Sequence, residues 1–193
     1  MNKTPSRTKQ ATHERIVATA ARVIRRSGYD GTSVAALMKE AGLTHGGFYA
    51  HFTSRDAMLA EAAGHAGAES VAVYSRIAGA VPANQSLEIL LRAYLSKEHL
   101  DNPECGCPIA ALGSETSRQS PAVRRAFTLR FKEMIDVVSR QSQDWGKPGT
   151  HDRALATAAT MVGAMVLARA VEDEALAESI LNAAKSQLMP PSS

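Results

Sequence analysis

The two cysteines of the chain, Cys105 and Cys107, are the residues best suited to covalent chemistry. Pro108 follows directly, and proline is favoured at the first position of a helix, so the sequence predicts a helix that starts at Pro108 with Cys107 as its N-cap. A thiol there would face unpaired amides and the positive end of the helix dipole, which lower its pKa. We hypothesise that Cys107 senses an electrophile or an oxidant, with Cys105 as partner thiol. The alternative is that Cys107 is a small buried residue in a loop.

Two other forms of chemistry are open to the same segment. A disulfide between residues i and i+2 would be strained, so oxidation predicts an adduct or a bond between subunits rather than a ring. A metal site would draw on His99 and the two cysteines, but three ligands without a clear fourth do not make one. We therefore expect neither a metal nor a cofactor.

Sequence signatures of common enzyme classes are missing from the chain. It has no HExxH, no GxSxG and no phosphate-binding glycine loop. The pair His151-Asp152 beside a stray serine does not make a triad, because such residues must converge in space. The sequence therefore predicts that the protein is not an enzyme, with an all-α enzyme or an adaptor protein as remote alternatives.

Segment 32–55 has the pattern of two short helices joined by a tight turn. Ser33 suits the N-cap of the first helix, and Gly42 follows where a helix end favours a residue with positive φ. Thr44 is the expected cap of a second helix over residues 45–52. Together these features predict a helix-turn-helix unit.

The second of these helices has an apolar and a polar face. Phe48 and Phe52 are four residues apart and are expected to point inward, whereas His45 and Tyr49 are expected to point outward. The outward residues are thus available for contacts with another molecule.

The run from Gly28 to Leu59, GYDGTSVAALMKEAGLTHGGFYAHFTSRDAML, resembles the DNA-binding segment of the TetR family of bacterial transcriptional regulators. The resemblance covers about the first third of the chain and implies a homodimeric repressor with a DNA-binding head, residues 1–54, and a helical effector-binding and dimerisation body, residues 55–193. The matching positions are Gly28, Ser33, Leu37, Ala41-Gly42-Leu43, Phe48-Tyr49, His51-Phe52 and Ser54-Arg55.

By position in this motif, one set of residues would face bases or adjacent phosphates of a double-stranded operator: Thr44, His45, Gly46 and Tyr49. Ser33, His51 and Arg55 would hold the DNA backbone, although each could instead cap or brace the fold. Gly46-Gly47 and Ala35 offer little side-chain readout, so DNA shape is expected to matter.

The distribution of charge supports a polyanion partner. Residues 1–55 contain nine Lys and Arg against three Asp and Glu, a net charge of +6, and the remainder of the chain sums to −3. Basic side chains neutralise phosphates and release counterions. We expect residues 1–12 to be a loose leader whose Lys3, Arg7 and Lys9 reach phosphates, or an ordinary frayed terminus.

The composition predicts an all-α fold. Hydrophobic residues make up 45% of the chain and aromatic residues 5%, and apolar residues recur at helical rather than alternating spacing. Asn84 or Ser86 is the expected cap of the helix after Pro82. About nine helices are predicted. Two are the short helices of segment 32–55, and the others lie at residues 11–27, 54–80, 84–101, 108–115, 121–145, 151–171 and 172–188.

The helix 54–80 is rich in small residues. These would permit the helix to slide against its neighbours or, alternatively, to pack closely against them.

The helix 151–171 is apolar around most of its circumference, so it must be covered on two sides, and we expect a second subunit to cover one of them. Its apolar run, 154–168, lies between Arg153 and Arg169 and is shorter than the roughly 20 residues of a membrane span. With no secretory signal, the sequence predicts a cytoplasmic protein without a membrane segment.

The alternative to a thiol sensor is a small-molecule effector bound non-covalently in the body. No charged pair marks the polar end of such a ligand. The residues expected to line its pocket, or simply to form core, are Leu91, Tyr94, Leu95, Phe127, Phe131, Met161 and Met165.

Overall fold

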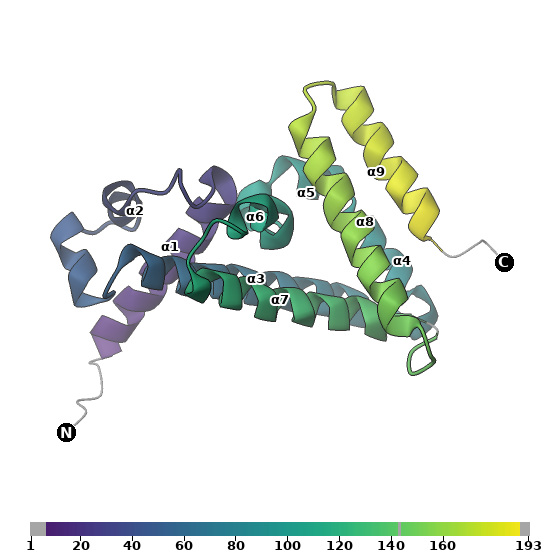
Figure 1. The fold of residues 1–193 in the computed structure, drawn as a ribbon, viewed down its shortest axis with the longest axis horizontal. Coiled ribbons are helices and arrows are strands. Elements are labelled where there is room, and N and C mark those ends of the chain that lie inside the picture. Colours follow the sequence, from purple (N-terminus) through teal and green to yellow (C-terminus); the bar gives the residue numbers. More distant parts are fainter. Residues whose placement is uncertain (1–6, 143, 190–193) are drawn as a thin grey trace.

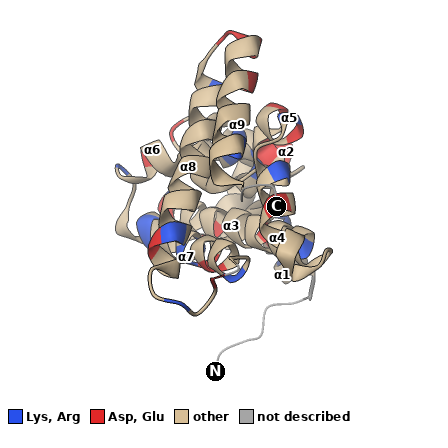
Figure 2. Ribbon diagram, turned by 90° about the vertical axis from the view of Figure 1, so that its right-hand side faces the viewer, with Lys and Arg blue, Asp and Glu red and all other residues tan. Residues whose placement is uncertain are grey.

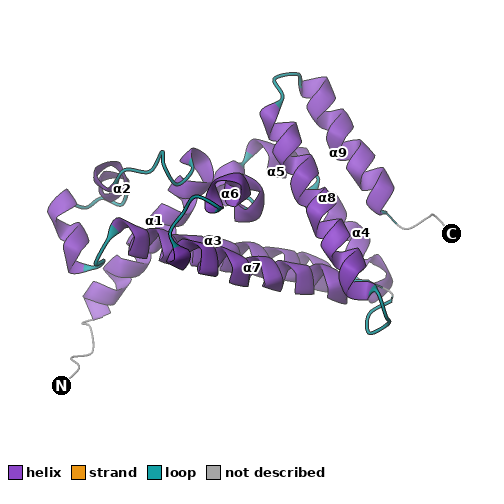
Figure 3. Cartoon of the chain, in the orientation of Figure 1, coloured by secondary structure: helices purple, strands orange, loops and turns teal. Residues whose placement is uncertain are grey.

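The structure, a computed structural model, describes residues 7–142 and 144–189. The predicted leader up to residue 6, including Lys3, and the tail from residue 190 lie outside the described residues, and of Arg7 only the backbone is described. Throughout the described ranges the chain is helical without strands, which confirms the all-α prediction (Figure 3). In chain order the elements are α1 (Arg7–Ser27), α2 (Val34–Glu40), the 3-10 helix η1 (His45–Ala50), α3 (Arg55–Gly79), α4 (Ala83–Tyr94), α5 (Lys97–Asp101), the 3-10 helix η2 (Pro103–Cys105), α6 (Pro108–Thr116), α7 (Pro121–Arg140), α8 (Thr150–Ala170) and α9 (Glu174–Leu188).

Helices α3 and α7 pack along each other and form the long base of the molecule (Figure 1). Helix α1 packs on α3 near one end, where α2 and η1 also lie. The α8–α9 hairpin rises from the opposite end of the base. From there α8 leans back over the base toward α5 and α6, so the hairpin lies on the side of the molecule away from α2 and η1.

The buried apolar residues form two clusters. The first joins α1, α2 and η1 to the beginning of α3, and it also includes Leu112 of α6 and Val123 of α7. The second fills the space between α3, α4, α7, α8 and α9. Because body helices contribute side chains to the first cluster, the helix-turn-helix is packed against α6 and α7 rather than attached by α3 alone.

The first helix begins at Arg7, so the prediction that residues 7–12 are a loose leader is wrong. Its first turns are held by side-chain bonds at helical spacing. The Gln10 amide donates to Glu14 at 2.9 Å, and the Thr12 hydroxyl donates to the Thr8 carbonyl at 2.9 Å. The helix ends where Gly28 adopts a φ of +73°, as predicted.

The second helix of the segment 32–55 differs from the prediction. It is the short 3-10 helix η1 and not an α-helix, and the Thr44 side chain makes no cap hydrogen bond within the described part of the chain. Gly46 and Gly47 supply no side chains to support an α-helical turn and have low helix propensity. The position of the helix is as expected, but its hydrogen bonding is not.

The predicted single helix over 84–101 is two helices. Leu95 leaves the helical conformation, and the Ser96 hydroxyl then caps α5 by accepting from the His99 amide at 3.1 Å. Ser86 is not an N-cap as predicted, because Pro82 takes that position and the Ser86 hydroxyl donates to the Ala78 carbonyl at 2.8 Å.

The small residues of α3 allow α7 to approach closely. A Cβ atom on Gly67 would lie 2.4 Å from Cβ and Cγ of Arg130 on α7, whereas nothing lies within 4 Å of a Cβ on Gly64. Of the two interpretations left open by the sequence, this contact supports close helix packing.

Gly67→Ala is expected to lower the free energy of unfolding by about 1–3 kcal/mol, because the added methyl group forces the α3–α7 contact apart. The matched change Gly64→Ala is expected to raise it by about 0.5–1 kcal/mol, because alanine is the better helix former in open space. Urea denaturation of both variants measures the difference, and equal stability of the two would contradict this packing.

Helix α8 is long and apolar enough, by length and composition alone, to cross a membrane: it has 21 residues, and its most apolar window of 18 residues has a mean hydropathy of 1.2. Core helices of soluble proteins meet the same test. Arg153 and Arg169 both lie inside the helix and still bound its uncharged run 154–168, which is the run that the sequence analysis considered. In this fold α8 packs against α7 and α9, which gives its apolar residues protein partners.

Candidate nucleic-acid interface and effector region

The helix-turn-helix is set by a cap and a glycine turn. The Ser33 hydroxyl accepts from the Ala36 amide at 3.1 Å, which confirms Ser33 as the N-cap of α2. Gly42 follows the helix with a φ of +68°, and the Leu43 amide donates to the Met38 carbonyl at 2.8 Å. The chain therefore reverses into η1 through the turn that the sequence predicts.

The two faces of η1 are as different as expected. Phe48 is 1% exposed and stacks on Phe52 with ring centroids 5.4 Å apart, whereas the next residue, Tyr49, is 70% exposed. The edge of the Tyr49 ring packs on Phe48 at 5.2 Å and approaches His45 at 6.5 Å. The exposed ring of Tyr49 is thus supported from below by the buried ring of Phe48.

The predicted base-facing residues Thr44, His45 and Gly46 are exposed beside Tyr49, and Ser33 is exposed at the start of α2. The structure therefore brings these predicted contacts to one exposed part of the molecule, at the end remote from α8 and α9 (Figure 1). Their contact with DNA stays a prediction.

Arg55, predicted to hold the DNA backbone, is engaged within the protein. Its Nε donates to the Thr32 carbonyl at 3.2 Å, and a second nitrogen donates to the Tyr29 carbonyl. These bonds tie the start of α3 to the segment before α2. A phosphate contact by Arg55 stays a prediction, and the structure adds an internal positioning role that the sequence did not indicate.

His51 is also turned toward the protein. Its ring lies 5.9 Å from that of His13 on α1, and its Nδ1 is buried without a hydrogen-bond partner in the described ranges. Burial lowers the pKa of His51, and the neighbouring His13 and Lys9 add to the effect. His13 in turn stacks on Phe52 and pairs with Glu61 at 2.7 Å. The arrangement favours the bracing role that the sequence analysis gave as the alternative for His51.

The end of α1 is bound to the segment that contains the cysteines. Arg26 pairs with Glu104 at 3.0 Å, and Arg25 donates to the Gly106 carbonyl at 3.4 Å and to Glu69 of α3 at 2.9 Å. We call residues 103–107 the cysteine loop. The sequence carried no signal for the two contacts with this loop, because they join residues about 80 positions apart.

A second link runs from α6 to the residues after α1. The Glu115 carboxylate accepts from the Tyr29 amide at 2.8 Å and lies against Gly28, where a Cβ atom would be 2.4 Å from it. Glycine is therefore required at position 28 both for its positive φ and for this contact. The head is connected to the body by α3, by the cysteine loop and by α6.

Cys107 occupies the predicted N-cap position of α6, with Pro108 at the first helical position. Its thiol is fully buried and makes no cap hydrogen bond within the ranges described, so the expectation of a thiol facing the α6 amides is wrong. Packing against the core takes the place of capping. Cys105 is exposed.

His99, considered only as a metal ligand in the sequence, organises the interior beside Cys107. Its Nδ1 donates to the Tyr94 carbonyl at 2.7 Å, and its Nε2 accepts from the Cys107 amide at 2.9 Å. Both ring nitrogens are therefore occupied, and no group of three metal ligands occurs within the described residues. Burial lowers the pKa of His99 to about 4; the bond to the Tyr94 carbonyl opposes this shift and Arg169 adds to it.

The predicted effector residues are parts of the second core. Tyr94, Met161 and Met165 are buried, and Phe127 is half-buried against them. A groove of about 450 Å³ lies nearby, lined by other residues, among them Val73, Tyr74, Ile77, His99, Cys105 and Gly106. Tyr74 is in van der Waals reach of Tyr94, with ring centroids 5.2 Å apart, so groove and core share an aromatic wall.

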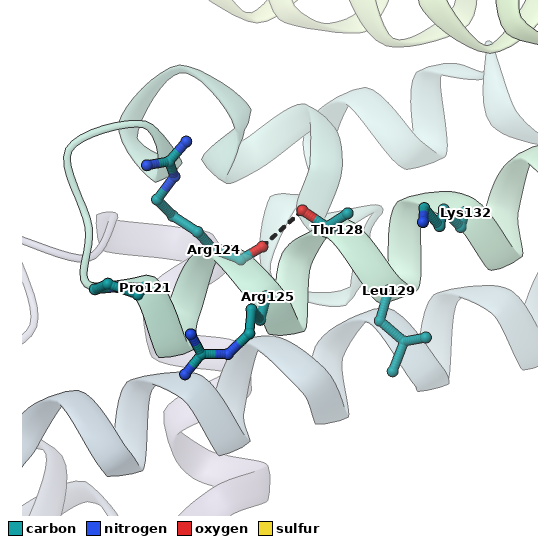
Figure 4. A pocket seen from close by; sticks show the side chains of 6 residues that line it. All are labelled: Pro121, Arg124, Arg125, Thr128, Leu129 and Lys132. Atoms are coloured by element: carbon teal, nitrogen blue, oxygen red, sulfur yellow. Dashed lines mark hydrogen bonds between the residues drawn. The ribbon is translucent and has the colours of Figure 1, made fainter.

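A basic hollow of about 460 Å³ on α7 is a weaker candidate site. It is lined by Arg124, Arg125, Leu129 and Lys132. Figure 4 shows the Arg124 and Arg125 side chains pointing to opposite sides of the helix, and the bond drawn there is the i,i+4 contact from the Thr128 hydroxyl to the Arg124 carbonyl at 2.8 Å. The basic groups therefore do not converge on one point.

The α8–α9 hairpin presents apolar side chains to solvent. Leu155, Val166 and Leu167 on α8 and Leu176 on α9 are exposed. In Figure 2 the two helices lie side by side and are tan along most of their length, with acidic residues where they are joined. Helix α8 has no charged residue between Arg153 and Arg169. An apolar surface of this kind is typical of a helical interface between subunits.

Two family profiles match the chain. One, for bacterial regulatory proteins of the tetR family, matches residues 16–62, and the other, for the C-terminal domain of LmrA/YxaF-like transcriptional regulators, matches residues 83–183. An uncharacterized HTH-type transcriptional regulator of Mycobacterium tuberculosis is 28% identical over 173 residues, which are 85% of this chain and 87% of that protein. The HTH-type transcriptional regulator LmrA of Bacillus subtilis is 28% identical over 158 residues, 79% and 81% of the two chains.

Solved structures of regulators share the fold. NemR of Escherichia coli in its reduced form has a TM-score of 0.78 at 19% identity, over 92% of this chain and 95% of that one. A TetR transcriptional regulator of Chloroflexus aurantiacus has a TM-score of 0.75 at 27% identity, over 94% of each chain. The likeness extends over both the helix-turn-helix and the body.

Proposed function

We propose, because this chain belongs to the TetR family of bacterial regulatory proteins, that it is a dimeric repressor which a small molecule releases from a palindromic DNA operator. Membership of the family makes it a DNA-binding transcriptional regulator. The sense of regulation, the effector and the cytoplasmic location are the parts that we propose.

The observation that carries the proposal is the exposed end of the helix-turn-helix. The side chains of three residues are exposed next to the buried Phe48: Thr44, His45 and Tyr49. The first 55 residues of the chain have a net charge of +6. The N-terminal part of the second helix of such a unit enters the major groove, and flanking contacts hold the phosphates. With two glycines in η1, most of the side-chain readout falls to Thr44, His45 and Tyr49.

Tyr49→Ala is expected to weaken binding to the DNA upstream of the protein's own gene about tenfold or more, because an exposed ring that contacts the groove is lost without a change in the core. A mobility shift assay at fixed ionic strength measures the effect. The matched control is Trp145→Ala, which removes a 57% exposed aromatic side chain from the loop before α8.

Unchanged affinity of Tyr49→Ala, or an equal loss in both variants, would remove Tyr49 from the interface. If the wild type itself shows no salt-dependent preference for this DNA over an unrelated duplex, the proposal that this DNA contains its operator fails. Measurable turnover of a substrate would instead favour the remote enzyme alternative.

The proposed homodimer would use the exposed apolar side chains of α8 and α9. A second copy placed against Leu155, Val166 and Leu167 would form an isologous four-helix contact and remove apolar area from water. Such symmetry implies two half-sites about one helical turn apart in the operator.

The cysteine loop offers a route from an effector to the head. One side of the loop borders the groove through Cys105 and Gly106, and its other side holds Arg25 and Arg26 of α1. A ligand that moves the loop therefore changes the contacts that orient α1.

Between the two effector classes, the structure supports a non-covalent ligand. Cys107 is fully buried and does not line the groove, so an electrophile would reach its thiol only after the cysteine loop moves, whereas the groove itself is open. Thiol sensing at Cys107, or at the exposed Cys105, is the alternative.

A further inference from the structure

Arg169, near the end of α8, is a half-buried arginine that pairs with no acidic residue in the described part of the chain. Its Nη2 donates to the His99 carbonyl at 2.5 Å and its Nε to the Leu100 carbonyl at 3.4 Å. Its Nη1 is buried and has no hydrogen-bond partner among the residues described, and no carboxylate there pairs with the guanidinium. A desolvated charge without a counter-charge is unfavourable, and burial lowers the pKa of Arg169 accordingly.

A second unsatisfied donor lies in the same region. Tyr94 is 1% exposed, and within the described ranges its hydroxyl makes no hydrogen bond of good geometry, although the Cys107 side chain lies close enough to interact with it. Burial raises the pKa of Tyr94 well above its ordinary value, and the neighbouring Cys107 adds to the effect, while Arg169 opposes it. The phenol therefore stays protonated and can donate. His99 contacts both residues, since its ring centroid lies 4.7 Å from that of Tyr94 and its carbonyl accepts from Arg169, so the two donors share one small region.

The groove approaches this region from solvent. His99 and Gly106 line the groove, and a Cβ atom on Gly106 would lie 3.1 Å from Arg169 Nη2 and 2.6 Å from the His99 ring. The guanidinium is thus directly behind Gly106. The outer part of the groove is apolar, with Val73, Ile77 and Ala93, and the exposed Glu98 also lines it.

We propose that Arg169 and Tyr94 bind the carboxylate of an amphipathic organic acid, whose apolar part lies in the groove against Val73, Tyr74 and Ile77. One carboxylate oxygen accepts from Arg169 Nη1 and the other from the Tyr94 hydroxyl. A buried guanidinium and a protonated phenol are suited to a carboxylate, because charge-assisted hydrogen bonds are strong where water is excluded. The proposal rests on the proposed function and names the chemical class of its effector.

The position of the site explains how binding would reach the head. A carboxylate that approaches Arg169 from the groove must displace Gly106, whose carbonyl accepts from Arg25 of α1. The same loop carries Glu104, which pairs with Arg26 alongside Glu40 of α2. Occupation of the site therefore changes two contacts of α1, which with α2 and η1 forms the first core.

The test is thermal unfolding of the full chain with three carboxylates, benzoate, phenylacetate and octanoate, each compared with its neutral amide. For a ligand at about ten times its dissociation constant, the midpoint is expected to rise by about 3–6 °C with a carboxylate and clearly less with the matching amide. Arg169→Gln is expected to abolish the difference. Arg153→Gln, an exposed arginine on the same helix, is expected to keep it.

A conservative second variant guards against misfolding of Arg169→Gln. Tyr94→Phe keeps the buried ring and is expected to weaken carboxylate binding about tenfold or more, because one hydrogen bond to a charged group is lost. The proposal is overturned if amides stabilise as much as carboxylates, if none of the three carboxylates exceeds its amide, or if Arg169→Gln and Tyr94→Phe respond like the wild type.

Mobility shift assays without and with ligand separate this proposal from the proposed function. Without ligand, Arg169→Gln is expected to bind DNA as the wild type does. With the carboxylate that stabilises the wild type, the wild type is expected to release the DNA and Arg169→Gln to stay bound. If the wild type binds the carboxylate but no DNA, the proposed function fails and the site stands. If it binds DNA but no carboxylate, the site fails alone.

Discussion

Phe48→Ala is expected to lower the free energy of unfolding by about 3–5 kcal/mol, the cost of removing a fully buried phenylalanine from a close-packed core. Phe48 is 1% exposed and stacks on Phe52 within the cluster that joins α1, α2, η1 and α3. Because η1 has only six residues and 3-10 hydrogen bonding, it has few other contacts that could keep its place. Binding to operator DNA is expected to be lost together with the stability.

Urea denaturation and a mobility shift assay of the same samples test this expectation, with the adjacent Tyr49→Ala as the matched control. The control removes an exposed ring, so its free energy of unfolding is expected to stay within about 0.5 kcal/mol of the wild type while its DNA binding falls. The assignment of the two faces of η1 would be reversed if Tyr49→Ala were the unstable variant and Phe48→Ala the stable one.

The stability of the protein is expected to fall by about 3 kcal/mol from His99 alone as the pH drops from about 7 to below 4. Burial holds the pKa of His99 at about 4 in the folded protein, against 6.5 ordinarily. Between these values the unfolded chain binds a proton that the folded chain does not, so this stability is complete above pH 6.5 and is lost as the pH falls toward 4.

The structural reason is that every side of the His99 ring is committed. Nε2 accepts from the Cys107 amide, and Nδ1 donates to the Tyr94 carbonyl. The Tyr74 hydroxyl lies 3.4 Å from Nδ1, and the positive charge of Arg169 disfavours a charged imidazole. A proton on Nε2 would face a donor and add a second charge beside a guanidinium. Protonation therefore breaks the contact that holds the cysteine loop on α5.

Urea denaturation at a series of pH values measures this effect as the difference between the wild type and His99→Gln. The wild type is expected to lose more stability on acidification than the variant. His51→Gln is the control, since burial lowers the pKa of His51 in the same direction at a site in the head. A His99→Gln protein with the same pH dependence as the wild type would show that another group titrates.

The helix-turn-helix could be predicted from sequence because its signals are local. Ser33 as a cap, Gly28 and Gly42 with positive φ, and the spacing of Phe48 and Phe52 each act within a few residues, and the structure confirms all of them. The predictions that were wrong concern extent and hydrogen bonding. One predicted helix is divided at Leu95, after which Ser96 caps α5. The first helix starts at Arg7, where side-chain bonds at i,i+4 join residues that were expected to be loose.

The effector region is different, because its residues are distant in the chain. Arg169 entered the sequence analysis only as the end of an apolar run, and His99 only as a weak metal ligand. A lone arginine among alanine, valine and leucine could have been noticed in the sequence. The residues that it contacts could not have been predicted. Arg169 donates to the carbonyl of His99, which is about 70 positions away in the chain. Every residue has a backbone carbonyl, so this partner leaves no mark in the sequence.

The sequence by itself determined that the chain is all-α, that it carries a helix-turn-helix with Tyr49 outward, and that its first 55 residues are basic, since helix periodicity, caps and charge act over short distances. The tertiary structure alone decided that Cys107 is buried, that Arg55 and His51 turn inward, and that Arg169 and Tyr94 keep unsatisfied donors beside one groove. Burial and charge pairing depend on which helices meet, and packing of α3, α5, α6 and α8 around the cysteine loop sets that result.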